Sequence, residues 1–165
     1  MALSAATAIW FIPFVVPICL YVAWTDLAYM KITNKAVLTL GAVYILLGPF
    51  ALPDLTSYFW GFGYFAIALV AGIALNAGGA MGAGDAKFIA FAAPFVAPKD
   101  AFTVSFILAV LLLAAVVTHR VVRATPLRNM APEWESWEQG RKFPMGLALG
   151  PTLALYLCLA ALNGA

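Results

Sequence analysis

The chain has 165 residues, of which 65% are hydrophobic and only 10% are charged. Soluble globular proteins carry about a quarter charged residues, so this composition excludes an ordinary soluble enzyme and indicates an integral membrane protein. The formal net charge of +2 gives no indication of a nucleic-acid partner, and none is expected. The length suits one domain, and we expect residues 1–165 to form a single membrane-embedded unit.

Six apolar segments predict an all-α fold, a polytopic bundle of six transmembrane helices. The segments run approximately over residues 5–24, 36–52, 58–77, 86–97, 101–118 and 143–162. A spanning helix needs about 20 apolar residues, with a range near 17 to 25. The fourth segment is shorter than that. It is expected to tilt little, to begin below the membrane surface, or to be a half-helix that faces a cavity.

The distribution of basic residues predicts the orientation of the bundle. Of the nine lysines and arginines, only Lys99 lies in a loop on one side, and the others lie in loops on the opposite side. Basic loops favour the cytoplasm, so both termini are expected to be extracytoplasmic, with Asp26 and Asp85 at the cytoplasmic face. Residues 1–7 lack the positive region that opens a cleaved signal peptide, so the first segment is expected to be retained.

Two carboxylates stand at the ends of apolar segments. Asp26 follows the first segment, and Asp85 lies in the glycine-rich turn at residues 79–87. A carboxylate at membrane depth is costly and marks function by default. Two carboxylates a few ångströms apart cannot both stay ionised, so such a pair holds one proton near neutrality. The charged member can then activate water while the protonated member donates to the carbonyl oxygen of a peptide bond.

Each aspartate also has a structural interpretation. Asp85 follows a glycine and precedes an apolar run, which is typical of a helix N-cap. Asp26 is suited to an ion pair with Lys31 or Lys35 at the membrane interface. The spacing alone does not decide between these roles and a catalytic pair.

Residues near the two aspartates are also candidates. Lys87 is either a cytoplasmic anchor or the charge partner of a carboxylate. Asn34 either caps the second segment, which is the favoured interpretation, or forms a hydrogen bond in the site. Gly82 and Gly84 suit a tight turn and the close approach of another helix.

The C-terminal part of the chain adds further candidates. Pro144 suits the first turn of the sixth segment, and Gly146 and Gly150 suit tight helix packing. Trp134 and Trp137 would share one face of a helix over residues 133–138. An interfacial helix with an aromatic anchor is favoured there, and a role in holding substrate is the alternative.

Metal and thiol chemistry is not expected. Cys19 and Cys158 lie inside separate apolar segments and form no CxxC pair, and His119 is the single histidine. These residues supply neither a zinc site nor a Ser–His–Asp triad. No metal and no cofactor is therefore expected.

Three motifs in order resemble those of the type IV prepilin peptidases, the membrane aspartyl proteases with a GxGD motif. Asp26 followed by KITN at residues 31–34 is similar to the family's D…(R/K)IPN, with Thr33 in place of the usual proline. GAGDAK at residues 82–87 matches GxGDxK, and FPMGLALG at residues 143–150 is similar to P-(F/Y)-G…G. The resemblance implies that Asp26 and Asp85 are catalytic. The residues it implies as substrate-binding or site-supporting are Gly82, Gly84, Lys87, Asn34, Pro144 and Gly146.

The resemblance also implies a reaction and its partners. The expected activity is removal of the basic leader of a type IV prepilin at the cytoplasmic face of the inner membrane, just before the pilin's hydrophobic helix. The methyltransferase domain of the large family members, with its paired CxxC motifs, is missing, so the chain resembles the short form that serves tight-adherence (Flp-type) pili. Glu133, Glu135 and Glu138 are expected to attract the basic leader.

Three alternatives remain open on the sequence. One is a preflagellin peptidase of the archaeal type, which shares the GxGD motif. Another is a small transporter with intramembrane carboxylates as ion or proton relays, which inverted repeats would favour, although the sequence suggests none. The third is a catalytically silent component of a pilus machine.

Overall fold

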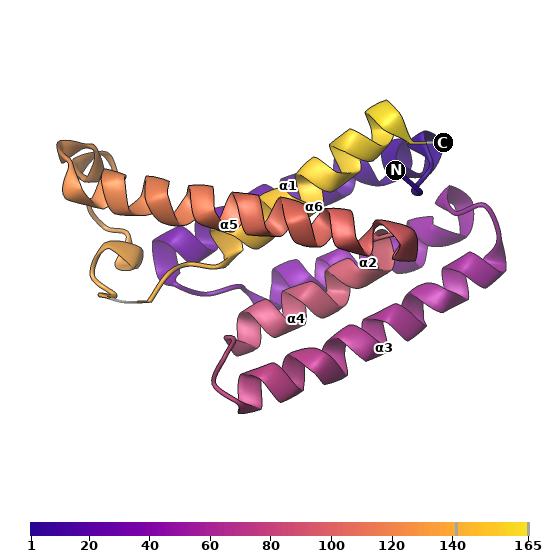
Figure 1. The fold of residues 1–165 in the computed structure, drawn as a ribbon, viewed down its shortest axis with the longest axis horizontal. Helices are drawn as coiled ribbons and strands as arrows, with labels where there is room; N and C mark the ends of the chain where they lie inside the picture. Colours follow the sequence, from indigo (N-terminus) through magenta and orange to yellow (C-terminus); the bar gives the residue numbers. More distant parts are fainter. Residues whose placement is uncertain (141, 165) are drawn as a thin grey trace.

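The regular elements of the protein are helices (Figure 1). The computed structural model describes residues 1–140 and 142–164, and it confirms the expected all-α polytopic bundle within them. The α-helices are α1 (Ala5–Tyr29), α2 (Asn34–Ala51), α3 (Leu55–Ala77), α4 (Ala83–Ala92), α5 (Ala101–Ala124) and α6 (Gly146–Asn163). All of these except α4 are long and apolar enough to cross a membrane.

The fourth apolar segment crosses the bundle in a broken form. α4 has 10 residues and is followed by two 3-10 turns, Ala93–Phe95 and Pro98–Asp100, each containing a proline that interrupts regular helix hydrogen bonding. Its start lies against the loop after α1, where Gly84 contacts Ile32. Its end lies at the opposite end of the bundle. The expectation that this segment is too short for a regular span is therefore confirmed.

Some helix ends differ from those expected. α1 continues to Tyr29 and α5 to Ala124, because hydropathy marks the apolar part of a helix and not the point where its hydrogen bonding stops. α6 begins at Gly146 and not at Phe143. A proline disfavours helical backbone in the residue before it, so Pro144 delays the helix and lies buried ahead of it, which corrects its predicted place in the first turn.

α1 and α6 form the most extensive helix pair and bring both termini to one end (Figure 1). There Gly164 contacts Leu3. Near the middle of the pair Gly150 lies against the carbonyl of Cys19, so a larger side chain would separate the helices. The predicted packing role of Gly150 is confirmed. Paired termini agree with an even number of crossings, and their extracytoplasmic placement stays a prediction.

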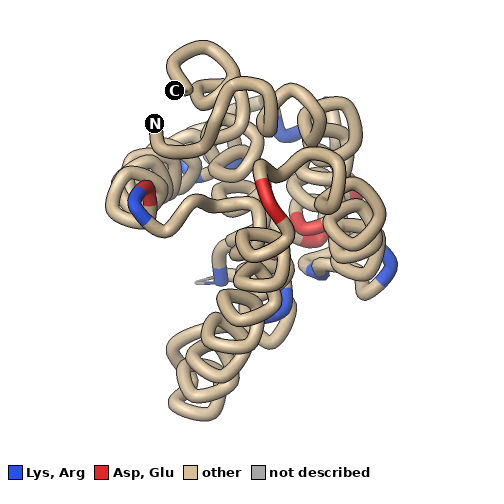
Figure 2. The backbone as a smooth tube through the Cα atoms, turned by 90° about the vertical axis from the view of Figure 1, so that its right-hand side faces the viewer, with Lys and Arg blue, Asp and Glu red and all other residues tan. Residues whose placement is uncertain are grey.

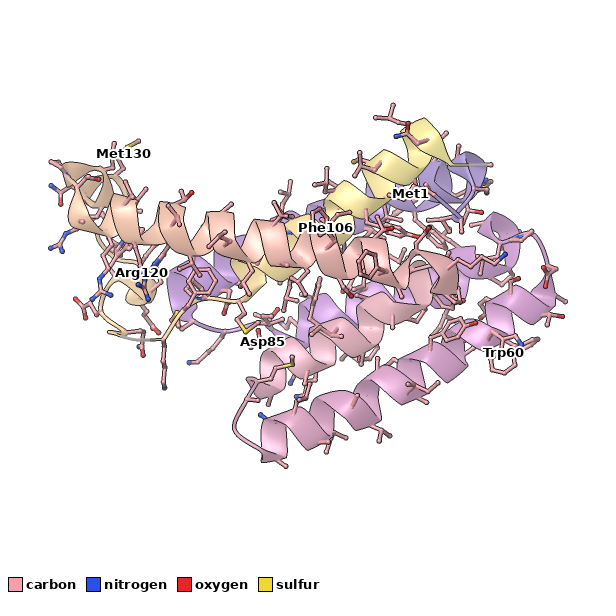
Figure 3. All side chains as sticks on the ribbon, in the orientation of Figure 1. Met1, Trp60, Asp85, Phe106, Arg120 and Met130 are labelled. Carbon is pink, nitrogen blue, oxygen red and sulfur yellow. The ribbon has the colours of Figure 1, made fainter. Side chains whose placement is uncertain are left out.

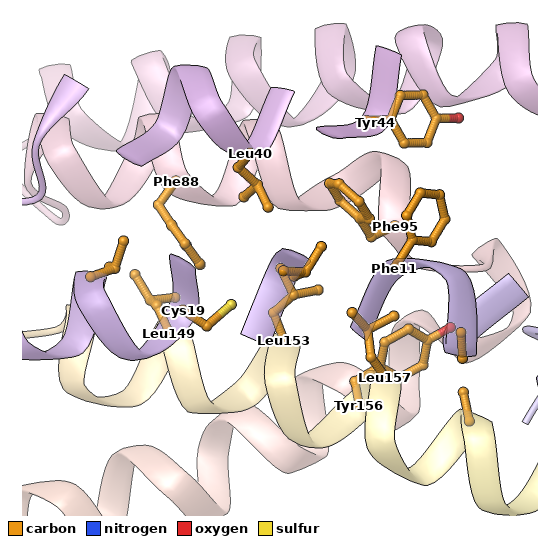
Figure 4. Close-up of a cluster of buried hydrophobic side chains, with 14 of the residues drawn as sticks. Phe11, Cys19, Leu40, Tyr44, Phe88, Phe95, Leu149, Leu153, Tyr156 and Leu157 are labelled. Carbon is orange, nitrogen blue, oxygen red and sulfur yellow. The ribbon is translucent and has the colours of Figure 1, made fainter. Parts of the chain in front are cut away.

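The apolar core lies between α1, α2, the fourth segment and α6 (Figure 4). Phe11 packs edge-on against Phe95, with ring centroids 4.9 Å apart, and stacks on Tyr44 at 6.2 Å. α5 contributes little to this core, since Ile107 and His119 are the buried side chains in it. The tight part of the bundle is therefore on the α1–α6 side, and the surface of α5 is mostly exposed.

Charged residues are few along the helices, and Figure 2 shows a tube that is mostly uncharged. Lys99 lies next to Asp100 at the end with the termini, where Asp100 binds the backbone of Ala2. Lys87 lies at the opposite end, at the start of α4. Arg141, one of the basic residues expected in the cytoplasmic loops, lies outside the described residues.

Candidate active site

Three helices and one loop meet at the end of the bundle opposite the termini. They are the last turns of α1, the loop at residues 30–33, and the first turns of α4 and α6. Figure 3 shows Asp85 at the start of α4, and Arg120 on the part of α5 that extends beyond it. A Cβ atom at position 84 would lie 3.3 Å from the Cβ atom of Ile32, so a glycine there allows α4 to approach the loop closely.

Asp26 is buried between α1 and α6, with 6% of its surface exposed. Its Oδ2 atom accepts a hydrogen bond of 2.6 Å from the backbone N–H of Gly146. A Cβ atom at position 146 would lie 2.8 Å from the Cβ atom of Asp26, so only glycine leaves room for this contact. Asp26 is thus held by the start of α6 and not by the predicted interfacial ion pair with Lys31 or Lys35.

Asp85 is partly buried in the first turn of α4. The N-cap of this helix is Gly82, so the interpretation of Asp85 as the cap residue is wrong. A Cβ atom at position 82 would lie 2.6 Å from Oδ2 of Asp85, and glycine therefore leaves space for the carboxylate. The start of α4 contacts the loop that follows α1, through Gly84 and Ile32. Asp26 and Asp85 therefore lie at the same end of the bundle.

Lys87 and Asn34 connect α4 to the start of α2. The Nζ atom of Lys87 donates a hydrogen bond of 3.1 Å to Oδ1 of Asn34, and both residues are exposed. Thr33 caps α2, since its side chain accepts from the backbone N–H of Ala36 at 3.3 Å, so the favoured interpretation of Asn34 as the cap is wrong. A proline at position 33 would lack this side-chain acceptor, so the departure from the family motif has a structural role here.

An aromatic cluster, which sequence reasoning did not find, supports the segment before Gly146. Phe143 packs edge-on against His119 with ring centroids 5.8 Å apart, and Trp137 stacks on His119 at 4.8 Å. Trp134 stacks on Trp137 at 5.6 Å. The signal in the sequence was the concentration of aromatic residues around the polar loop, but their partner, the single histidine, lies on a different element.

The expected interfacial helix over residues 133–138 is not present. Only Glu135–Trp137 form a short 3-10 turn. Trp137 is 8% exposed, and its Nε1–H donates to the carbonyl of Ala131 at 2.8 Å. The expectation of a shared helix face is therefore wrong, although the two tryptophans stack on each other and Trp137 is turned inward on His119.

Candidate metal ligands do not gather at this site. Within residues 1–140 and 142–164, no three side chains of histidine, cysteine, aspartate or glutamate are placed together as ligands. The donor that the structure gives to the Asp26 carboxylate is the backbone N–H of Gly146. This arrangement is suited to acid–base chemistry on a bound polar group.

Comparison with known proteins identifies the family. No curated protein and no solved structure matches the chain. The family model of the type IV leader peptidases (Peptidase_A24) matches residues 13–118, which is well over half of the chain and includes both Asp26 and Asp85. The glycine-containing motif at the start of α6 lies beyond the matched residues. The chain therefore belongs to the type IV leader peptidase family and is a multi-pass membrane peptidase.

Proposed function

We propose that the protein removes the basic leader from type IV prepilins of the Flp type at the cytoplasmic face of the inner membrane. The whole chain, residues 1–165, acts as one membrane-embedded peptidase unit. The observation that carries this proposal is the placement of Asp26 and Asp85 at the same end of the bundle, with Asp26 bound to the start of α6. The partners are the prepilin and the lipid bilayer.

In the proposed mechanism the aspartate pair holds one proton. The ionised carboxylate takes a proton from a water molecule as this water attacks the carbonyl carbon of the scissile bond. The protonated carboxyl group donates its proton to the carbonyl oxygen, which gives a neutral tetrahedral intermediate. Breakdown of the intermediate returns a proton to the pair, protonates the leaving amine and releases the leader with a new carboxylate. No metal and no covalent intermediate takes part in this scheme.

The neighbouring residues hold this pair in place. The backbone N–H of Gly146 fixes the orientation of the Asp26 carboxylate. The close contact of Gly84 with Ile32 and the hydrogen bond from Lys87 to Asn34 both fix the start of α4, which carries Asp85. These residues therefore affect the reaction indirectly, by positioning the carboxylates of Asp26 and Asp85.

The leader is proposed to lie along the loop between α5 and α6. The 3-10 turn Glu135–Trp137 of this loop packs against α1, the helix that carries Asp26. The exposed carboxylates of this loop, which oppose the charge of a basic leader, belong to Glu133, Glu135 and Glu138. Replacing all three by lysine is expected to weaken cleavage, and unchanged cleavage would remove this part of the proposal.

The experiment that tests the function is cleavage of a tagged Flp-type prepilin, followed by the shift of the product on a gel. Asp26→Asn and Asp85→Asn are each expected to lower the rate at least about a hundredfold, because asparagine keeps the shape but cannot transfer the proton. Asp54→Asn is the matched control, since Asp54 caps α3 and asparagine caps almost equally well.

The outcomes separate the remaining alternatives. If both single variants still cleave the prepilin, the pair is not catalytic. If the wild-type protein cleaves a preflagellin and not a prepilin, the substrate belongs to the archaeal type. The family match already favours a peptidase over the transporter alternative.

A further inference from the structure

An apolar groove of about 410 Å³ lies between α4, α5 and α6. Phe88, Val104 and Leu153 are among the residues that line it. The hydroxyl groups of Ser105 and Thr152 in its wall donate to carbonyl groups of their own helices, at 2.9 and 2.7 Å. These hydroxyls are therefore already paired, and the groove suits an apolar occupant.

The groove begins directly inside the aspartate pair. Phe88 follows Asp85 by three residues on α4, and Leu149 follows Gly146 by three residues on α6. Residues at this spacing lie on the same face of a helix. The lining continues to Pro98, at the end of the bundle that holds the termini. The groove thus runs along the bundle from the candidate active site toward the opposite end.

The arrangement of the helices explains why this space is open. α5 packs chiefly on α6, whereas α4 packs on α3 and α2. Small residues stand among larger apolar ones on the sides formed by the fourth segment and α5, namely Ala92, Ala93, Ala101 and Ser105. Small side chains in a membrane allow the backbone of another helix to come close. This feature favours a peptide helix over a lipid chain as the occupant.

We propose that the groove receives the apolar helix of the prepilin that directly follows the scissile bond, an inference that rests on the proposed function. This helix runs parallel to α4 and α6 and antiparallel to α5. An apolar segment must enter the bilayer as a helix because its backbone groups find no water there. The scissile bond is placed ahead of the N-cap residue of this helix, where the carbonyl group is outside the helical hydrogen-bond pattern and is free to meet Asp26 and Asp85.

The groove therefore determines where the substrate is cut. A helix that docks along it with one face presents its N-terminal end at the mouth of the bundle, and the leader stays outside the membrane. The substrate is then recognised by an apolar helix on one side of the cut and by basic residues on the other.

Tryptophan substitutions on α5 test this proposal with matched neighbours. Ala101→Trp and Ser105→Trp place a bulky ring in the groove, whereas Phe102→Trp and Phe106→Trp change adjacent exposed residues that do not line it. Each variant is assayed in lipid vesicles on a full prepilin and on a short peptide that contains the leader and the cleavage site without the apolar helix.

The expected result is a selective loss. The groove variants slow cleavage of the full prepilin about tenfold more than cleavage of the short peptide, and the two controls show no such difference. Equal effects on both substrates, or none on the full prepilin, would overturn the proposal and leave the groove to lipid. If the wild-type protein cleaves neither substrate, the proposed function fails as well.

Cross-linking gives a second measurement that does not depend on turnover of the short peptide. A photoreactive amino acid is placed at position 105 or 106 in the Asp85→Asn background, which holds uncleaved prepilin. Position 105 is expected to cross-link to the apolar helix of the prepilin several times more than position 106. Equal cross-linking at the two positions would contradict the proposal.

Discussion

The two ends of the bundle each bury an aspartate, and the two residues differ in how their oxygen atoms are used. Asp26 and Asp100 are 6% and 5% exposed. Asp100 accepts hydrogen bonds from the backbone N–H groups of Ala2 and Leu3 and from the hydroxyl of Tyr156, at 2.8 to 3.1 Å. Asp26, among the described residues, accepts one such bond to its side chain, from Gly146.

This difference separates a structural carboxylate from a reactive one. The oxygen atoms of Asp100 are occupied by donors that join the N-terminal segment, the fourth segment and α6. Asp26 keeps one oxygen free of protein donors in the described part of the chain, and it lies at the same end of the bundle as a second carboxylate, Asp85. Burial alone therefore does not mark function here, and the free oxygen beside another acid is the distinguishing feature.

The largest expected effects come from replacing each aspartate by asparagine. Asp26→Asn abolishes cleavage and changes the free energy of unfolding by less than about 1 kcal/mol, because the amide oxygen still accepts from Gly146. Asp100→Asn has the opposite result. It lowers stability by about 2–3 kcal/mol, since the amide group loses the charge and turns a donor toward backbone N–H groups, while each folded molecule still cleaves.

Denaturant unfolding in detergent and cleavage per folded molecule measure the two effects. The comparison fails if both variants lose stability and activity in the same proportion.

The next effect concerns the room for the reactive aspartate. Gly146→Ala places a Cβ atom 2.8 Å from the Cβ atom of Asp26, so the carboxylate must move. A displacement of about 1 Å at a catalytic group costs on the order of a hundredfold in rate, and this is the loss expected. Gly63→Ala is the control, because its Cβ atom would meet only Trp60, at an ordinary 3.4 Å. Normal cleavage by Gly146→Ala would show that the Asp26 contact is not needed.

A smaller effect is expected at the aromatic cluster, where His119 is a positioning residue. His119→Ala removes the ring between Trp137 and Phe143 and loosens the segment that leads to Gly146. We expect kcat to fall about tenfold with KM nearly constant, because only the geometry of the Asp26 contact changes. His119→Phe keeps an aromatic ring and is expected to restore kcat. A loss of stability with normal kcat would show that this cluster contributes only to packing.

The sequence alone was enough to identify features that are unusual for a membrane helix. Asp26 and Asp85 stand out because carboxylates next to apolar segments are rare, and the short fourth segment stands out by its length. The motifs around them also led to the family that residues 13–118 match. These features are local, so they could be read before any contact was known.

What the sequence did not reveal depends on contacts between distant residues. Asp100 follows Lys99 in an ordinary loop pattern, and its partners Ala2, Leu3 and Tyr156 are far away along the chain. The stack of His119 with Trp137 likewise joins two elements. The sequence favours Asn34 as the cap of α2, and the structure places Thr33 there. Both residue types cap helices, so the residue at which the helix begins decides between them.

The smallest expected effect concerns Tyr156, which binds the structural aspartate Asp100. The hydroxyl of Tyr156 donates to Asp100 at 3.0 Å and accepts from the backbone N–H of Ala97 at 3.1 Å. Tyr156→Phe removes both bonds and is expected to lower stability by about 1 kcal/mol, because two backbone donors still hold Asp100. Tyr21→Phe, at an exposed ring, is the control. Cleavage per folded molecule should be normal in both, since Tyr156 lies at the end away from Asp26. A slower rate in Tyr156→Phe alone would mean that the two ends of the bundle are coupled.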